Sequence, residues 1–132
     1  MRDAAARARA EQHVKAGKLT KEEAKARAEQ AERARRQQQA EQAMELGFKF
    51  GIGGPITYER AKKMRALIAG LPRETLLLQT DAPDQPDAQH HNQRNEPAYL
   101  VNVLECLSEL RNEPAEDIAR ETTRNAKQLF NI

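Results

Sequence analysis

The residue best placed to carry chemistry is Asp81, which ends an unbroken run of apolar and β-compatible residues. The run is Thr-Leu-Leu-Leu-Gln-Thr-Asp, residues 75–81, and Pro83 closes it shortly afterwards. An apolar run of this length between turn signals predicts a strand that is buried on both faces. Because α/β proteins place their chemistry at the carboxyl ends of parallel strands, Asp81 is the first candidate for a functional residue.

A long polar loop, residues 82–97, follows Asp81 directly. It contains the adjacent histidines His90 and His91 and many amide and charged side chains. A loop of this length without secondary structure of its own is usually functional or disordered. Its position immediately after Asp81 favours a functional loop.

A short strand is predicted before this unit, next to a glycine-rich turn. Phe48, Phe50 and Ile52 alternate at a period of two, which is typical of a strand. Three glycines accompany them: Gly51, Gly53 and Gly54. Glycines let the backbone turn sharply or approach another segment closely. The string lacks the Lys-Ser/Thr ending of a phosphate-binding P-loop, so a tight strand-to-helix turn is the simpler interpretation.

A helix is predicted over residues 58–70, with Thr57 as its cap and Gly70 at its end. Its apolar residues recur at helical spacing and form the expected buried face: Ala61, Met64, Leu67 and Ile68. Together with the strand of residues 75–81, this pattern is a βαβ unit, which implies a parallel sheet and a right-handed crossover.

Two further helices are expected over residues 97–111 and 114–129, with Phe130 anchoring the end of the second. Cys106 lies inside the first of them and is expected to be an inert, partly buried thiol.

Residues 1–46 differ in composition from the rest of the chain, because Ala, Arg, Glu, Gln and Lys dominate them. These are strong helix formers. A helix is expected over residues 21–46, with Thr20 and Glu23 as a capping box and Gly47 as its stop. The segment lacks an apolar stripe, which predicts a solvated helical extension. A basic arm that touches nucleic acid is the alternative.

Composition limits the possible functions. The formal net charge is only +2, which gives no global electrostatic argument for nucleic acid. The single cysteine excludes an internal disulfide framework and fits a reducing compartment. No apolar run approaches the length of a membrane span, and no signal-peptide pattern follows Met1, so a soluble cytoplasmic protein without a membrane partner is expected.

Four motifs occur in order along residues 42–130. They are Gly47-Phe-Lys-Phe-Gly-Ile-Gly-Gly, Leu76-Leu-Leu-Gln-Thr-Asp-Ala-Pro, Arg94-Asn-Glu-Pro-Ala-Tyr-Leu and Thr123-Arg-Asn-Ala-Lys-Gln-Leu-Phe. Their order and spacing resemble the C-terminal third of the TatD family of metal-dependent deoxyribonucleases and hydrolases. The resemblance implies an α/β fold that is part of a (β/α)8 TIM-type barrel. Residues 47–132 would supply its last two parallel strands, 48–54 and 75–81, and its closing helices, and residues 1–46 would be a helical extension.

The resemblance also implies a function, the metal-dependent hydrolysis of phosphoester bonds, with DNA as the expected substrate. Asp81 corresponds to the acid on the last strand, where it would ligate a divalent ion such as Mg²⁺, Mn²⁺ or Zn²⁺ or act as general base for the attacking water. The loop residues Arg94, Asn95 and Glu96 would contact a phosphate or brace the loop, and bracing is favoured.

The sequence departs from the family pattern at the remaining metal ligands. The family's His-x-His pair is absent, and the adjacent histidines His90 and His91 do not replace it. Gln79 stands where the family commonly has Glu two residues before Asp81. With one carboxylate remaining, the metal site is short of ligands, so we expect little or no activity from this chain alone.

The two predicted strands also lack the neighbours that a complete barrel would provide. We therefore expect a truncated or fused gene product, a piece of a larger assembly or an engineered polypeptide, with possible self-association through exposed strand edges. The competing hypothesis is a non-catalytic binding or assembly module, in which the helical arm recruits a partner or contacts nucleic acid.

Overall fold

A computed structural model of the chain describes residues 4–9 and 19–132. Residues 1–43 and 44–132 form two separate compact units, which are described here one at a time. Of the helical extension predicted over residues 1–46, residues 1–3 and 10–18 lie outside the described ranges.

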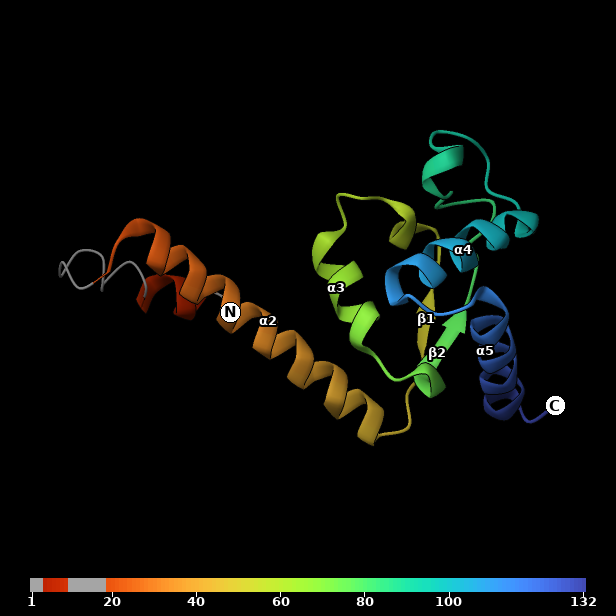
Figure 1. The fold of residues 1–132 in the computed structure, drawn as a ribbon, viewed down its shortest axis with the longest axis horizontal. Coiled ribbons are helices and arrows are strands. Elements are labelled where there is room, and N and C mark those ends of the chain that lie inside the picture. Colours follow the sequence, from red (N-terminus) through yellow and green to blue (C-terminus); the bar gives the residue numbers. More distant parts are fainter. Residues whose placement is uncertain (1–3, 10–18) are drawn as a thin grey trace. The chain divides into compact units, whose positions relative to one another are not determined.

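The first unit is dominated by one long polar helix, α2 (Lys21–Glu45), and residues 4–9 are also helical (Figure 1). The amide of Glu23 donates to Thr20 Oγ1 at 3.1 Å, which confirms the predicted helix start. Gly47 follows the helix with a φ of +81°, a value that glycine adopts readily, which confirms the predicted stop. Nearly all side chains of α2 are exposed or half-buried, as the missing apolar stripe predicts.

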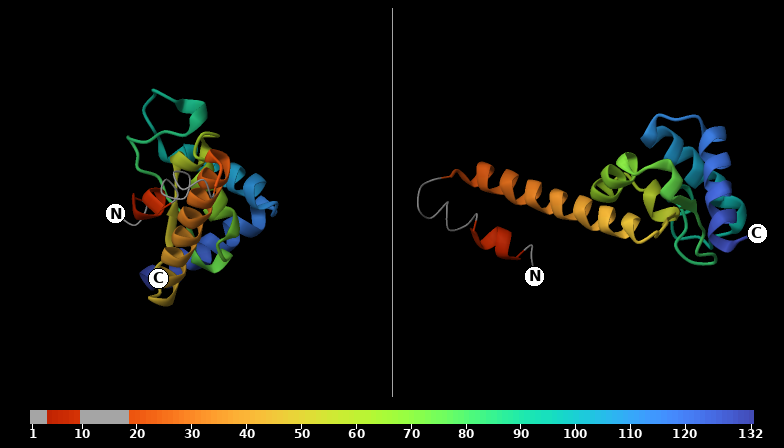
Figure 2. Two further views of the ribbon diagram at one scale, coloured as in Figure 1. Left: turned by 90° about the vertical axis from the view of Figure 1, so that its left-hand side faces the viewer. Right: turned by 90° about the horizontal axis from the view of Figure 1, so that it is seen from below.

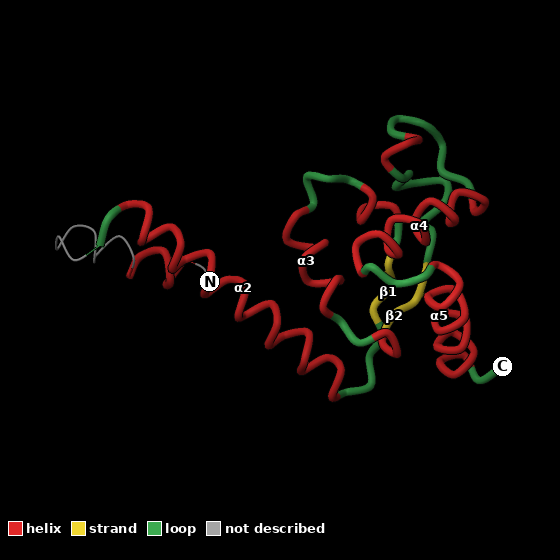
Figure 3. Tube along the Cα trace, in the orientation of Figure 1, coloured by secondary structure: helices red, strands yellow, loops and turns green. Residues whose placement is uncertain are grey.

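Two parallel strands form the centre of the second unit (Figures 1 and 3). They are β1 (Phe50–Ile52) and β2 (Leu76–Leu78), with Gly51 opposite Leu77. The parallel pairing confirms the predicted βαβ unit. Both strands are shorter than the sequence predicts; a 3₁₀ turn begins at Gly54 after β1, and another, Arg73–Thr75, precedes β2.

The connection between the strands corrects the predicted helix of residues 58–70. A 3₁₀ turn, Gly54–Thr57, comes first, and helix α3 (Lys62–Gly70) begins only four residues after Tyr58. Thr57 does not cap α3. Its hydroxyl donates to the carbonyl of the first residue of the turn at 2.6 Å and accepts from the amide of Ala88 at 2.8 Å.

Helices α4 (Leu100–Arg111) and α5 (Ala115–Phe130) lie beside each other (Figure 2), and both contact β2. A 3₁₀ turn, Pro97–Tyr99, precedes α4, and the left-handed residues Asn112 and Asn131 end the two helices. Both helices are therefore confirmed to within a few residues. None of the helices in the described ranges is long and apolar enough to cross a membrane.

The core of this unit lies between the sheet and the helices. Its buried apolar side chains come from both strands, from α3, α4 and α5, and from the segments that join them: Ile52, Ile56, Ile68, Leu71, Leu76, Val103, Leu107 and Ile118. Such burial is the main favourable term in the stability of the unit.

Two predicted core positions are wrong. Met64 is 45% exposed, because the face of α3 that meets α4 runs through Arg65 and Ile68, and the Arg65 guanidinium reaches Cys106 Sγ at 3.6 Å. Phe130 is 67% exposed and does not anchor α5, since it lies beyond Asn125, the last buried residue of that helix.

Candidate functional site

Asp81 lies just beyond the carboxyl end of β2, at the edge of the sheet where β1 also ends. Its side chain is exposed, and no donor or cation among the described residues contacts its carboxylate. Its backbone carbonyl accepts from the amide of Asp84 at 2.8 Å, which forms a tight turn at the start of the following loop. The strand end therefore presents one unengaged carboxylate to solvent.

Gln79 extends the strand pairing and packs against β1. Its amide donates to the carbonyl of Ile52 at 2.9 Å, one residue beyond the end of β2. Its side chain lies against Gly51, where an added Cβ would be only 2.1 Å from Gln79 Oε1. This neutral amide adds no negative charge two residues before Asp81.

Asn95 braces the loop of residues 82–97. Its side chain is buried, and Nδ2 donates to Thr80 Oγ1 at 3.1 Å and to the carbonyl of Asp84 at 2.9 Å. Its backbone amide donates to the carbonyl of Pro83 at 2.9 Å. The far end of the loop is therefore fastened to its beginning, next to the strand end that carries Asp81.

The neighbours of Asn95 behave differently. Arg94 and Glu96 are both exposed, and the part of the chain that the structure describes shows no side-chain hydrogen bond or ion pair for either. The structure thus brings Asn95 close to the strand end but leaves Arg94 and Glu96 at the surface. Their predicted contact with substrate stays a prediction.

Asp87 is a buried carboxylate that the sequence analysis missed. It is only 2% exposed; its Oδ1 accepts from the amide of Gln89 at 2.9 Å, and its Oδ2 accepts from His90 Nδ1 at 2.9 Å and Asn102 Nδ2 at 3.4 Å. Burial alone raises the pKa of Asp87, but these hydrogen bonds and the nearby His90 outweigh it and hold the pKa below its usual value. A local signal existed, since Asp commonly accepts from the backbone two residues on at the start of a turn.

The two adjacent histidines have different partners. The His90 ring stacks on Tyr99, with ring centroids 3.6 Å apart and an interplanar angle of 6°, while its Nδ1 is bound to Asp87. His91 instead meets Tyr58 edge to face at 5.8 Å, with its Nδ1 3.2 Å from the tyrosine hydroxyl. His90 therefore holds the loop together, whereas His91 remains exposed at its surface.

Gly54 allows the turn after β1 to touch the loop after β2. A Cβ at this position would lie 2.4 Å from the carbonyl oxygen of Gln85 and 3.1 Å from the carbonyl carbon of Pro86. Both are backbone atoms, so any side chain would push the loop away. The close approach expected of the glycine cluster is confirmed at Gly54.

The residues present do not by themselves fit a divalent metal ion. Nowhere in residues 4–9 and 19–132 do three His, Cys, Asp or Glu side chains gather closely enough to hold one. Asp81 offers a single carboxylate, while Nδ1 of His90 is engaged by Asp87. Structural and catalytic metal sites need three or more protein or water ligands around the ion.

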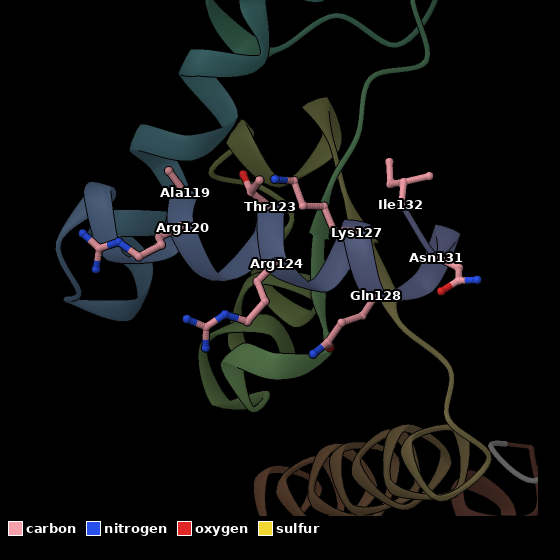
Figure 4. A pocket seen from close by; sticks show the side chains of 8 residues that line it. All are labelled: Ala119, Arg120, Thr123, Arg124, Lys127, Gln128, Asn131 and Ile132. Carbon is pink, nitrogen blue, oxygen red and sulfur yellow. The ribbon is translucent and has the colours of Figure 1, made fainter.

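The closing helix is tied to β2 by Asn125. This side chain is fully buried, and its Nδ2 donates to the carbonyls of Arg73 at 2.9 Å and Leu76 at 2.8 Å. The motif Thr123-Arg-Asn-Ala-Lys-Gln-Leu-Phe thus contains the residue that fixes α5 on the strand leading to Asp81. The outer face of α5, by contrast, forms a shallow hollow whose lining includes Arg120 (Figure 4).

Comparison with known proteins identifies relatives of this chain. The sequence profile described as TatD related DNase matches residues 11–131. The "Uncharacterized metal-dependent hydrolase YjjV" of Escherichia coli K12 is 50% identical over 95 residues, which cover 72% of this chain and 37% of the relative. The "3'-5' ssDNA/RNA exonuclease TatD" of Pantoea sp. (strain At-9b) is 34% identical over 100 residues, which cover 72% of this chain and 38% of the relative.

Solved structures give the same result. The crystal structure of YJJV, a TATD homolog from E. coli K12, is 49% identical, has a TM-score of 0.68 and is matched over 73% of this chain and 37% of its own. The TatD family hydrolase from Entamoeba histolytica shares the fold, with a TM-score of 0.57 at 15% identity, over 69% of this chain and 38% of its own. These neighbours are TIM-barrel proteins, which confirms the predicted α/β class and partial barrel.

The chain spans little more than a third of the length of the curated relatives it matches. The matched region begins at residue 11 and so includes α2, and the separate origin of the helical extension stays a prediction. A match of this extent, together with the identity to YjjV, settles the family. The chain belongs to the TatD-related DNase family.

Proposed function

We propose that this chain forms part of a metal-dependent hydrolase that cleaves phosphoester bonds in nucleic acid, with Asp81 as one functional carboxylate. The observation that carries the proposal is the place of Asp81 at the carboxyl end of β2, exposed and without a partner among the described residues. An unengaged carboxylate can accept a proton or bind a hard cation. The family and the exonuclease named among the relatives support the reaction and substrate class.

We also propose that this chain alone is a truncated form of the barrel with an incomplete metal site. One exposed carboxylate is available at the strand end, and the described residues offer no cluster of three ligands. The other donors are then expected from barrel strands outside these 132 residues. A polypeptide with this donor set holds a divalent ion weakly and hydrolyses DNA poorly.

The second part of the proposal is tested with the purified chain and a labelled single-stranded oligonucleotide. We expect no cleavage above the EDTA control in Mg²⁺, Mn²⁺ or Zn²⁺. Cleavage that depends on the metal and disappears in Asp81→Asn would show that the chain completes a site by itself.

The role of Asp81 is tested in a chimera, in which residues 44–132 replace the matching part of the Pantoea exonuclease. In an active chimera, Asp81→Asn is expected to lower kcat/KM by about 10² to 10⁴. Asp84→Asn is the matched control, since Asp84 is an exposed carboxylate three residues further along the same loop. An active chimera that responds equally to both substitutions would refute a role for Asp81.

A further inference from the structure

A pocket of about 440 Å³ lies between the turn after β1 and the loop after β2. Its lining includes the side chains of Tyr58, Arg60, His91, Asn92 and Gln93, and none of its nine lining residues is acidic. Both segments start at the carboxyl edge of the sheet, the edge that also carries the strand end described above. The pocket combines an aromatic ring, an imidazole, a guanidinium and amide groups in one hollow.

Hydrogen bonds fix the aromatic wall of this pocket. The hydroxyl of Tyr58 lies 3.0 Å from the carbonyl oxygen of Pro86, which can only accept. The single hydroxyl proton is therefore used there, so His91 Nδ1, at 3.2 Å, must donate to the tyrosine oxygen. This leaves Nε2 as the ring nitrogen of the exposed His91 that can meet an outside partner.

Arg60 places a positive charge over the same wall. Its guanidinium carbon lies 4.8 Å from the centroid of the Tyr58 ring, and its side chain is exposed. Residues 58–65 carry four bases and one acid, Glu59, so this segment has a net positive charge even though the chain as a whole is nearly neutral. Guanidinium planes and aromatic rings are the groups on which unpaired bases stack, and the same cation attracts phosphate.

We propose that this pocket binds one nucleotide of a single-stranded nucleic acid. The base contacts Tyr58 and His91, the amides of Asn92 and Gln93 meet its edge, and Arg60 faces the adjacent phosphate. The assignment rests on the proposed function, because a strand held here continues toward the carboxylate at the same edge of the sheet. A base within a duplex has its faces covered by its neighbours, so a single strand is the form that fits.

The outer face of α5 is the competing basic surface, and its cations are engaged differently. Arg120 lies 3.4 Å from Asp117, and Arg124 lies 3.7 Å from Glu121, so each arginine has an acid one turn away. The hollow on this face, shown in Figure 4, has no aromatic residue in its lining. Two of the three cations that line it are thus paired with acids and it offers no stacking platform, so Arg120 provides a charge-matched control.

The test is fluorescence anisotropy of the full chain with a labelled oligothymidylate of about ten nucleotides, at low salt and in EDTA. Arg60→Gln is expected to weaken binding and to reduce the slope of log K against log salt by about 1. Tyr58→Leu is expected to weaken binding by about 5- to 150-fold, whereas Tyr58→Phe, which keeps the ring, retains most of it. Arg120→Gln removes the same charge and is expected to leave the affinity nearly unchanged.

Three results would overturn the proposal: no binding by the unaltered chain, equal loss with Arg60→Gln and Arg120→Gln, or equal affinity for a duplex of the same length. Arg60 is exposed, so its variant tests the idea even if Tyr58→Leu fails to fold. EDTA excludes hydrolysis from this assay. If the chimera shows no role for Asp81, the proposed function is refuted. The binding assay tests the pocket independently of that result.

Discussion

Replacing Asn125 by alanine tests whether one side chain fastens the closing helix to the sheet. Asn125 is fully buried in α5, and its amide group donates to two backbone carbonyls, those of Arg73 and Leu76. Alanine is the best helix former, so the helix itself loses nothing by the change. The cost falls on the two carbonyls, which lose this hydrogen-bond donor; the bond to Leu76 is buried and the bond to Arg73 is partly buried.

The magnitude follows from the number of bonds. Two hydrogen bonds contribute about 1–3 kcal/mol, and the carbonyls left without this donor add a desolvation cost of about 1–3 kcal/mol. Asn125 Oδ1 is buried and has no partner among the described residues, so its removal offsets about 1 kcal/mol of this loss of stability. We expect a net loss of about 1–5 kcal/mol, against a total of about 5–13 kcal/mol for a unit the size of residues 44–132.

Asn125→Asp is a sharper test, because it keeps the size and shape of the side chain and removes only the amide group that donates the two hydrogen bonds. The introduced carboxyl would face two carbonyl oxygens in a buried site, which raises its pKa above the unfolded value when the chain folds. A carboxyl with a raised folded pKa destabilises the fold at neutral pH, and the loss shrinks as the pH falls and the group becomes protonated. Asn125→Ala should show no such recovery.

Urea unfolding followed by tyrosine fluorescence isolates the relevant unit, since the chain has no Trp and both of its tyrosines, Tyr58 and Tyr99, lie within residues 44–132. Gln128→Ala is the control, because Gln128 is an exposed amide on the same helix and should change stability by less than about 0.5 kcal/mol. A midpoint for Asn125→Ala equal to that of the control would refute the reasoning.

Two further predictions use the perturbed ionisable groups. The pKa of Asp87 lies below its usual 3.8 in the folded chain, so the contribution of Asp87 to stability is complete above pH 3.8 and is lost as the pH falls through the folded pKa. Between neutral and acid pH, the urea midpoint of Asp87→Asn should therefore fall less steeply than that of the unaltered chain. Parallel curves for the two proteins would contradict this. Burial raises the pKa of the Cys106 thiol, so iodoacetamide should alkylate it more slowly in the native chain than in urea, as mass spectrometry would show; equal rates would contradict this.

The elements defined by local sequence were predicted well. The apolar run of β2 and the two closing helices follow from periodicity and turn residues that lie within a few positions of one another, although β2 ends at Leu78 rather than at Asp81. The capped start of α2 at Thr20 and its stop at Gly47 have equally local causes. The motif around Asn125 was recognised as a family feature, but only the structure shows what its side chain holds.

The errors come from contacts between residues far apart in the sequence. Thr57 does not cap α3, because the helix begins only at Lys62 and the Thr57 hydroxyl instead accepts from the amide of Ala88, 31 residues later. Asp87 is buried because Asn102, 15 residues on in α4, helps to satisfy it, whereas the sequence shows only a polar loop. Met64 was predicted in the core from the helical spacing of apolar residues, while Arg65 occupies the packed face.

The contact between Gly54 and the loop has a consequence for how such a protein can evolve. Gly54 lets the loop approach closely at Gln85 and Pro86, and Asn95 ties its far end back to the residues after β2. Between these anchors, residues 91–94 are four consecutive exposed positions. Substitutions and insertions there can alter what the loop recognises without displacing the strand end. Residues 91–94 can therefore vary, whereas Gly54 and Asn95 are constrained by their contacts.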